Sequence, residues 1–103
     1  MNPQFVLSPE AALDLVEIWR YILRKENLDV ADRVESVILE KLAYLAGTPG
    51  GGHSRKDLTS EDVRFFPVYS YLIVYRARTI PLEVVAILHG GRELKRLLKT
   101  RLL

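Results

Sequence analysis

Hydrophobic and polar residues in the first half of the chain follow the period of two amphipathic helices. After residue 9, apolar side chains recur at intervals of three and four, which places them on one stripe of a helix. Ser8 can cap the free N–H groups of this helix, and Pro9 suits a first turn in which the backbone N–H needs no partner. The pattern predicts a helix from Pro9, preceded by a short strand over residues 4–7. The stripe comprises Ala12, Leu15, Val16, Trp19, Ile22 and Leu23.

A second helix is predicted from about Val30 to Ala46, after a break at residues 27–29. Gly47 occupies the position of a C-terminal cap, and Pro49 prevents the helix from continuing. Two helices joined by a short link predict an antiparallel hairpin, and their apolar stripes need a common surface to pack on. The second stripe comprises Val30, Val34, Val37, Ile38, Leu42, Leu45 and the aliphatic stem of Lys41.

The second half supplies that surface. Residues 63–66, 69–76 and 82–89 are rich in aromatic and β-branched side chains, with a turn over residues 77–81, and predict an antiparallel meander. Residues 92–103 predict a last, basic amphipathic helix, which we expect to dock on this protein's own sheet or on a partner rather than on a membrane. The sequence therefore predicts an α+β fold of two layers in the order β-α-α-β-β-β-α, with the helical hairpin on a small, mainly antiparallel sheet.

Composition narrows the class of protein. The 103 residues fit a single domain spanning 1–103, and a hydrophobic share of 49% argues against disorder. The absence of cysteine excludes disulfides, thiolate metal sites and cysteine nucleophiles. No apolar run approaches the roughly 18 residues that span a membrane, and the first residues lack the pattern of a secretory signal. We therefore expect a cytoplasmic protein that works at an exposed surface.

The net charge of +2 is the sum of two unlike halves. Residues 1–52 carry five Lys or Arg and eight Asp or Glu, whereas residues 53–103 carry ten and five. This asymmetry indicates a basic surface built by the second half, which would face an anionic partner. Uneven solvation of an ordinary surface is the alternative.

Three familiar catalytic or ligand motifs are absent. The segment 47–54 nearly spells a phosphate-binding loop, but it has His53 in place of the required lysine and follows a helix instead of preceding one. We interpret it as a mobile connector. His89 and Glu93 are four residues apart, a spacing that could hold a metal only within one continuous helix, and Gly90 and Gly91 interrupt such a helix. No Ser-His-Asp arrangement is supported either. We expect neither a metal nor another cofactor.

Basic residues and aromatic residues are interleaved in the second half. Strand alternation places Glu83, Val85, Ile87 and His89 on one face, so that His89 would lie at the end of an open surface if no helix covers that face. The aromatic side chains could stack on single-stranded nucleic acid, or they could form the core. For Arg64 and Arg76 the alternative to a binding role is an ion pair with Glu83 or Asp62. The aromatic residues concerned are Phe65, Phe66, Tyr69, Tyr71 and Tyr75.

Four segments together resemble the ParE toxins of the RelE/ParE toxin–antitoxin superfamily. They are a basic loop ending in leucine, a Val-Arg strand, a Tyr-Leu-Ile-x-Tyr-Arg strand and a closing Leu-His-Gly-x-Arg-Glu-Leu, and with the preceding strand and hairpin they cover nearly the whole chain. The segments are Ser54–Leu58, Val63–Pro67, Tyr71–Arg76 and Leu88–Leu94.

The resemblance implies the small RelE-like fold and a bacterial toxin that a cognate antitoxin neutralises in a hetero-oligomer. ParE members block DNA gyrase, whereas RelE members cleave mRNA on the ribosome without a metal. The closing motif favours gyrase inhibition without catalytic residues, and no tyrosine follows Tyr75. The alternative is an endoribonuclease that uses Arg64, Arg76, His89 and Arg92. We expect contacts with target or antitoxin at Arg55, Lys56, Arg64, Arg76, His89, Arg92, Lys95, Arg96 and Lys99.

Overall fold

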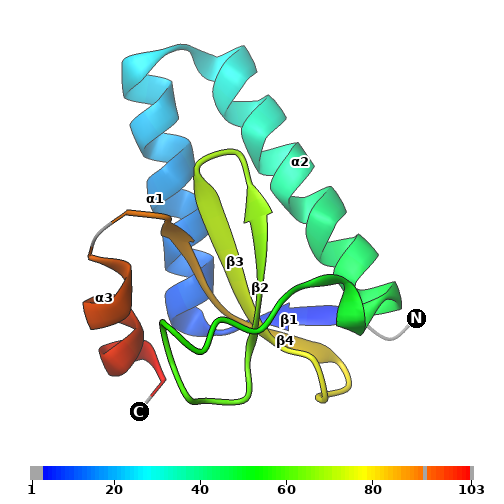
Figure 1. The fold of residues 1–103 in the computed structure, drawn as a ribbon. Helices are drawn as coiled ribbons and strands as arrows, with labels where there is room; N and C mark the ends of the chain where they lie inside the picture. Colours follow the sequence, from blue (N-terminus) through cyan, green and yellow to red (C-terminus); the bar gives the residue numbers. More distant parts are fainter. Residues whose placement is uncertain (1–3, 92, 103) are drawn as a thin grey trace.

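The computed structural model describes residues 4–91 and 93–102 and combines a four-stranded sheet with a helical hairpin (Figure 1). The observed order of elements agrees with the predicted α+β fold. The elements are β1 (Phe5–Leu7), α1 (Pro9–Lys25), α2 (Leu28–Gly47), a 3-10 turn η1 (Pro49–Gly51), β2 (Arg64–Val68), β3 (Tyr71–Arg76), β4 (Leu82–His89) and α3 (Leu94–Arg101).

The strands lie in the order β1-β4-β3-β2. β2, β3 and β4 form the antiparallel meander that the short connections predict, and β1 pairs in parallel with β4 through Phe5–Leu7 and Leu82–Val84. The sheet is therefore mainly antiparallel, as predicted.

Side-chain caps determine where the two long helices begin. The hydroxyl oxygen of Ser8 accepts a hydrogen bond from the Ala11 N–H at 3.0 Å, which confirms the predicted start of α1. The side-chain oxygen of Asn27 accepts from the Val30 N–H at 2.9 Å, so α2 begins at Leu28 and not at Val30. The break predicted at residues 27–29 therefore contains the cap itself. Gly47 is the last residue of α2 and has no positive φ, so it is not the left-handed cap that its position suggested.

Each face of the sheet carries its own apolar core. The hairpin buries Leu15, Ile18, Ile38 and Leu42 against one face. On the other face α3 inserts its apolar stripe, together with Val63 and Phe65 and the half-buried Leu58 from the segment before β2. Docking of the last helix on the protein's own sheet is thereby confirmed. This helix begins at Leu94, and Arg92, where we expected it to start, lies outside the described residues.

β2 and β3 form a tight hairpin whose boundaries differ from the prediction. β2 continues through Pro67 to Val68, and the turn is Tyr69–Ser70, where Tyr69 has a φ of 55°. Proline is tolerated in β2 because this is an edge strand. The backbone N–H of Phe65 points away from β3 and bonds to His53. The backbone nitrogen of Pro67, two residues further along, points the same way, so β3 loses no hydrogen bond. A proline that would interrupt a central strand is harmless here.

A bulge in β4 breaks the predicted side-chain alternation. Val74 pairs with Ala86 and Tyr75 with Val84, which leaves Val85 as an extra residue. As a result Val85 packs on the α3 side, whereas Ile87 packs on the hairpin side. The expectation that Val85, Ile87 and His89 share one face is wrong, because one inserted residue reverses the alternation that follows it.

Candidate functional site

The connector between α2 and β2 is fixed by a buried tyrosine. Tyr75 is fully buried, and its hydroxyl donates to the Pro49 carbonyl at 2.7 Å while accepting from the Gly52 N–H at 2.8 Å. The Arg64 guanidinium donates to the Gly52 carbonyl at 2.7 Å. These bonds hold residues 49–52, so the interpretation of this segment as a mobile connector is wrong. Burial raises the pKa of the Tyr75 hydroxyl.

The two arginines of the strands are engaged within the protein. Arg64 is half-buried, and its guanidinium is bonded to the Gly52 carbonyl. Arg76 forms an ion pair with Glu83 at 3.1 Å. The internal ion pair that we considered for Arg76 is therefore present, whereas Arg64 binds a backbone carbonyl instead of a carboxylate. Asp62 pairs with Arg78 at 3.1 Å.

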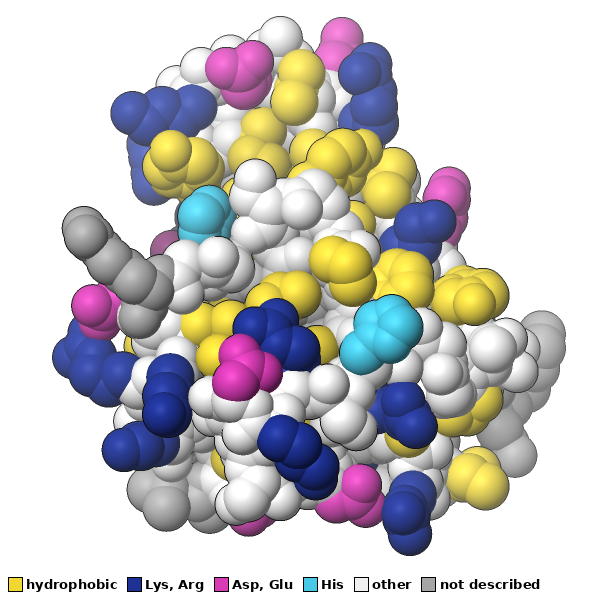
Figure 2. Space-filling view, in the orientation of Figure 1, with side chains coloured by type: hydrophobic (Ala, Val, Ile, Leu, Met, Phe, Trp, Pro, Cys, Tyr) yellow, Lys and Arg dark blue, Asp and Glu magenta, His cyan; other side chains and the backbone are white. Residues whose placement is uncertain are grey.

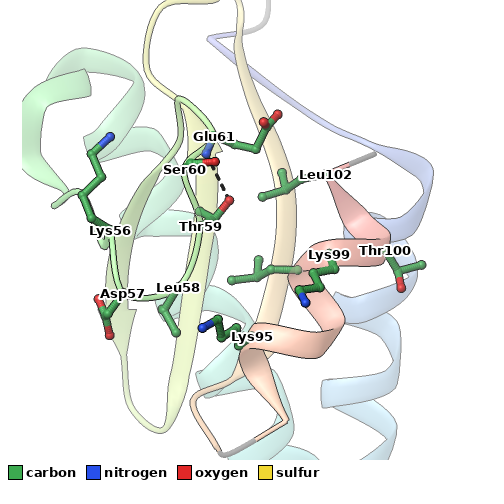
Figure 3. Close-up of a pocket in the computed structure, with 11 residues that line it drawn as sticks. Lys56, Asp57, Leu58, Thr59, Ser60, Glu61, Lys95, Lys99, Thr100 and Leu102 are labelled. Carbon is green, nitrogen blue, oxygen red and sulfur yellow. Dashed lines mark hydrogen bonds between the residues drawn. The ribbon is translucent and has the colours of Figure 1, made fainter.

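A groove lies between residues 56–61 and α3, with a volume of about 560 Å³ (Figure 3). Its floor contains Leu98 and Leu102, which are buried. Lys95 and Lys99 extend from α3 on one side of the groove, and Lys56 belongs to the loop on the other side, where it points away from α3. Among the described residues, none of these three lysines forms an ion pair.

Other predicted basic residues near this groove have acidic partners. Arg55 forms an ion pair with Asp57 at 2.8 Å, and this contact lowers the pKa of the Asp57 carboxyl. Arg96 of α3 forms an ion pair with Glu93, the residue just before this helix. Among the described residues, the unpaired positive charge of the groove therefore comes from the three lysines. Figure 2 shows Lys and Arg side chains more densely over the lower half of the molecule, and hydrophobic side chains over the upper and middle parts.

His89 lies in a different place from the strand arginines. Tyr71 pairs with His89 at one end of β3, whereas Tyr75 and Arg76 pair with Arg64 and Glu83 at the other end. Five residues of strand separate the two ends by about 17 Å. The fold therefore does not bring His89 together with Arg64 and Arg76, and Arg92 lies outside the described residues.

His89 instead borders a cleft of about 610 Å³ between α1 and the ends of β3 and β4. The rings of Tyr71 and His89 meet edge to face, with centroids 5.8 Å apart. Tyr21 and Arg24 of α1 complete the wall, and neither was among the predicted site residues. Both residues are next to the apolar stripe of α1 in the sequence pattern, which could have marked them as the border of a buried face. Only the packing of α1 on β4 brings them close to His89.

The aromatic residues of the sheet belong mostly to the core. Phe65 and Tyr75 are buried, and Phe66 is half-buried against the hairpin and against the ring of Tyr44. The core interpretation of these three residues is confirmed, so they do not form a stacking surface for nucleic acid. Tyr69, at the β2–β3 turn, is 61% exposed.

Neither a metal-binding cluster nor a membrane-crossing helix is found in the part of the chain that the structure describes. Residues 4–91 and 93–102 contain no group of three His, Asp or Glu side chains placed to hold a metal ion. Within the same ranges, no helix has the length and apolar character needed to cross a membrane.

Comparisons with known proteins agree with this architecture. The model of a family described as "ParE toxin of type II toxin-antitoxin system, parDE" matches residues 5–94. A solved structure titled "Chromosomal ParDE TA system from P. aeruginosa" superimposes with a TM-score of 0.73, at 17% sequence identity, over 84% of this chain and 95% of that chain. A search of curated proteins gave no match.

Proposed function

Since the chain belongs to the ParE toxin family of type II toxin–antitoxin systems, we propose that it inhibits DNA gyrase and that a cognate antitoxin neutralises it. The family match over residues 5–94 carries this proposal. The separation of His89 from Arg64 and Arg76 supports it, since RNA cleavage needs an acid or base close to the cations that stabilise phosphate charge.

The groove beside α3 is the surface that we assign to the target. Lys56, Lys95 and Lys99 have no ion-pair partner among the described residues, so their charge is available to an acidic surface. Exposed cations of this kind speed association with an anionic partner and orient it. Arg64 and Arg76 contribute less, because their guanidinium groups are already bonded within the protein.

The outer side of the hairpin is the surface that we assign to the antitoxin. Leu13, Val16 and Leu23 lie on one side of α1, away from the buried Ala11, Leu15 and Ile18, and are 57%, 41% and 38% exposed. The prediction that Val16 and Leu23 belong to the apolar stripe of this helix is therefore wrong. On the second helix Leu28 and Leu39 are also exposed. A series of exposed apolar side chains along a helical hairpin is typical of a protein-binding surface. We call Leu13, Val16, Leu23, Leu28 and Leu39 the outer hairpin surface.

A gyrase supercoiling assay tests the proposal. We expect the wild-type protein to inhibit supercoiling or to accumulate cleaved DNA, and unimpaired supercoiling at a large excess of toxin would refute gyrase as the target. The double variant Lys95→Glu/Lys99→Glu should lose most of the inhibition. The double variant Lys25→Glu/Lys41→Glu is the matched control, since it changes the net charge equally at exposed positions of the hairpin.

The outcome of this comparison also tests the assigned surface. If both double variants lose inhibition equally, net charge rather than the groove governs binding. A parallel assay for mRNA cleavage in a translation extract covers the alternative activity. Cleavage that His89→Ala abolishes would favour the endoribonuclease over the gyrase inhibitor.

A further inference from the structure

The cleft beside His89 has the composition of a binding pocket. Its floor is apolar, with Ile18 and Ile87 at most 8% exposed, and its rim is formed by the more exposed Tyr21, Tyr71 and His89. A volume of about 610 Å³ lies within the range of about 300–1,000 Å³ that is typical of ligand pockets. The residues that line the cleft belong mainly to α1 and to the end of β4. Figure 1 shows this end of β4 beside α1.

The polar groups around the cleft have few partners in the protein. The hydroxyls of Tyr21 and Tyr71 and the imidazole of His89 make no side-chain hydrogen bond among the described residues. Arg24 and Glu17 form no ion pair there. Asp14, in contrast, is occupied at the base of the cleft by Arg101 and by the Ile87 N–H. The rim therefore offers unused donors and acceptors above an apolar floor.

The charges of the rim are arranged as a dipole. Glu17 and Arg24 lie seven residues apart on α1, a rise of about 10 Å along the helix. The cation therefore stands at one end of the cleft and the carboxylate at the other. A complementary occupant has a hydrogen-bond donor at the Glu17 end and an acceptor at the Arg24 end, with an apolar body between them.

An aromatic side chain fits this description better than an aliphatic one. Tyr71 and His89 already meet edge to face, and a third ring can extend the same arrangement, since edge-to-face and offset contacts stabilise aromatic pairs beyond the burial of their area. The guanidinium of Arg24 can also lie over a ring face or bind a carboxylate beside it. Buried tryptophan and tyrosine anchors dominate many protein interfaces in pockets of this kind.

We propose that this cleft receives an aromatic side chain of the antitoxin, adjacent in sequence to an acidic residue that binds Arg24. The inference rests on the proposed function for the existence of the antitoxin. The cleft would be a second contact site for the antitoxin, which we call the anchor. It lies on the side of α1 that faces the sheet, whereas the outer hairpin surface lies on the other side of the same helix. An antitoxin segment that contacts both would pass around α1.

The anchor can be tested with short peptides and the isolated protein. The chain has two histidines, His53 and His89, on different parts of the fold, so their imidazole NMR signals act as probe and internal control. We expect acetyl-Trp-Glu-amide to shift the His89 signal at millimolar concentration and to leave the His53 signal unchanged. Acetyl-Leu-Glu-amide and acetyl-Trp-Gln-amide should bind more weakly, because the first lacks the ring and the second lacks the carboxylate.

Variants test the same anchor in the complete complex. Tyr21→Ala and Arg24→Ala change exposed residues, and each should weaken binding of the cognate antitoxin about tenfold or more, which corresponds to about 1.4 kcal/mol. Ile80→Ala is the matched apolar control, since Ile80 is 99% exposed in the β3–β4 turn, and Arg33→Ala is the matched control for charge. Both controls should retain affinity.

The results separate this inference from the proposed function. Equal shifts of both histidines, a leucine peptide as effective as the tryptophan peptide, or unchanged antitoxin affinity in Tyr21→Ala would overturn the anchor. Gyrase inhibition by Tyr21→Ala without antitoxin should equal that of the wild type, because the cleft is distinct from the groove beside α3. If the wild type itself neither inhibits gyrase nor binds an antitoxin, the proposed function fails instead.

Discussion

Replacing Gly52 by alanine should destabilise the protein strongly, although the backbone conformation at this position suits any residue. Gly52 has a φ of −87°, so its importance does not come from the left-handed region. A Cβ added there would lie 2.5 Å from the Tyr75 hydroxyl, 2.8 Å from its ring and 2.9 Å from the Phe65 carbonyl. Ordinary contacts begin near 3.4 Å. The substitution therefore requires a movement of about 1 Å, estimated from ordinary packing distances.

The surroundings of Gly52 cannot easily make this movement. Tyr75 is fully buried and held by two hydrogen bonds, and the Phe65 carbonyl belongs to the β2 backbone. Moving Gly52 would weaken its bonds to Tyr75 and Arg64. Overpacking costs about 1–3 kcal/mol, and a buried hydrogen bond contributes about 1 kcal/mol. We expect a loss of about 3 kcal/mol in the free energy of unfolding, and a decrease in Tm of about 12–24 °C.

Thermal and urea unfolding of Gly52→Ala and Gly47→Ala measure this effect. At Gly47 an added Cβ meets nothing within 4 Å, and the residue is helical, so alanine there should be neutral or stabilise by up to about 1 kcal/mol. The reasoning is refuted if Gly52→Ala unfolds within about 1 kcal/mol of the wild type, on the scale of ordinary surface substitutions.

Three further results are expected. Arg101→Ala should lower the free energy of unfolding in urea by about 2 kcal/mol, because it removes two hydrogen bonds of 2.8 and 2.5 Å to the largely buried Asp14. Arg96→Ala, at an exposed ion pair, should lower it by under about 0.5 kcal/mol. Equal losses in the two variants would contradict this. Burial raises the pKa of Tyr75 in the folded protein, so the stability that it contributes is present below pH 10 and is lost as the pH rises through the raised folded pKa. Urea midpoints from pH 8 to 11 should therefore fall less steeply in Tyr75→Phe. In about 1 M NaCl the affinity for the antitoxin should fall by about tenfold, the share of the screened Arg24 pair, whereas gyrase inhibition through the lysine groove should weaken more. Titrations at low and high salt that show the larger loss for the antitoxin complex would contradict this order.

The elements of the fold were largely predictable because their signals are local. The stripe of apolar residues and the cap at Ser8 predict α1, and both are properties of a few consecutive residues. The burial of Phe65 and Tyr75 also agrees with prediction, since large aromatic side chains in strands are usually internal. The errors at Asn27 and at Pro67 are errors of one or two residues at boundaries.

The candidate site was predictable only in its composition. The basic character of α3 follows from its sequence, and the structure places Lys95 and Lys99 beside a groove as a consequence. Which basic residues remain free does not follow, because Arg76 meets Glu83 only through the register of β3 and β4. The same register places His89 about 17 Å from Arg76 and so separates two residues of the predicted endoribonuclease set.

The sequence by itself determined the helical hairpin, the meander, the last helix and the membership of the family, because periodicity, caps and ordered motifs depend on residue type and spacing. Tertiary structure alone decided the side on which His89 lies, since a single bulged residue in β4 reverses the alternation of the strand. It also decided the clamp of Tyr75 on Gly52 and the pair of Asp14 with Arg101, which join residues 23 and 87 positions apart. Contacts over such separations depend on how whole elements pack, and no local pattern encodes them.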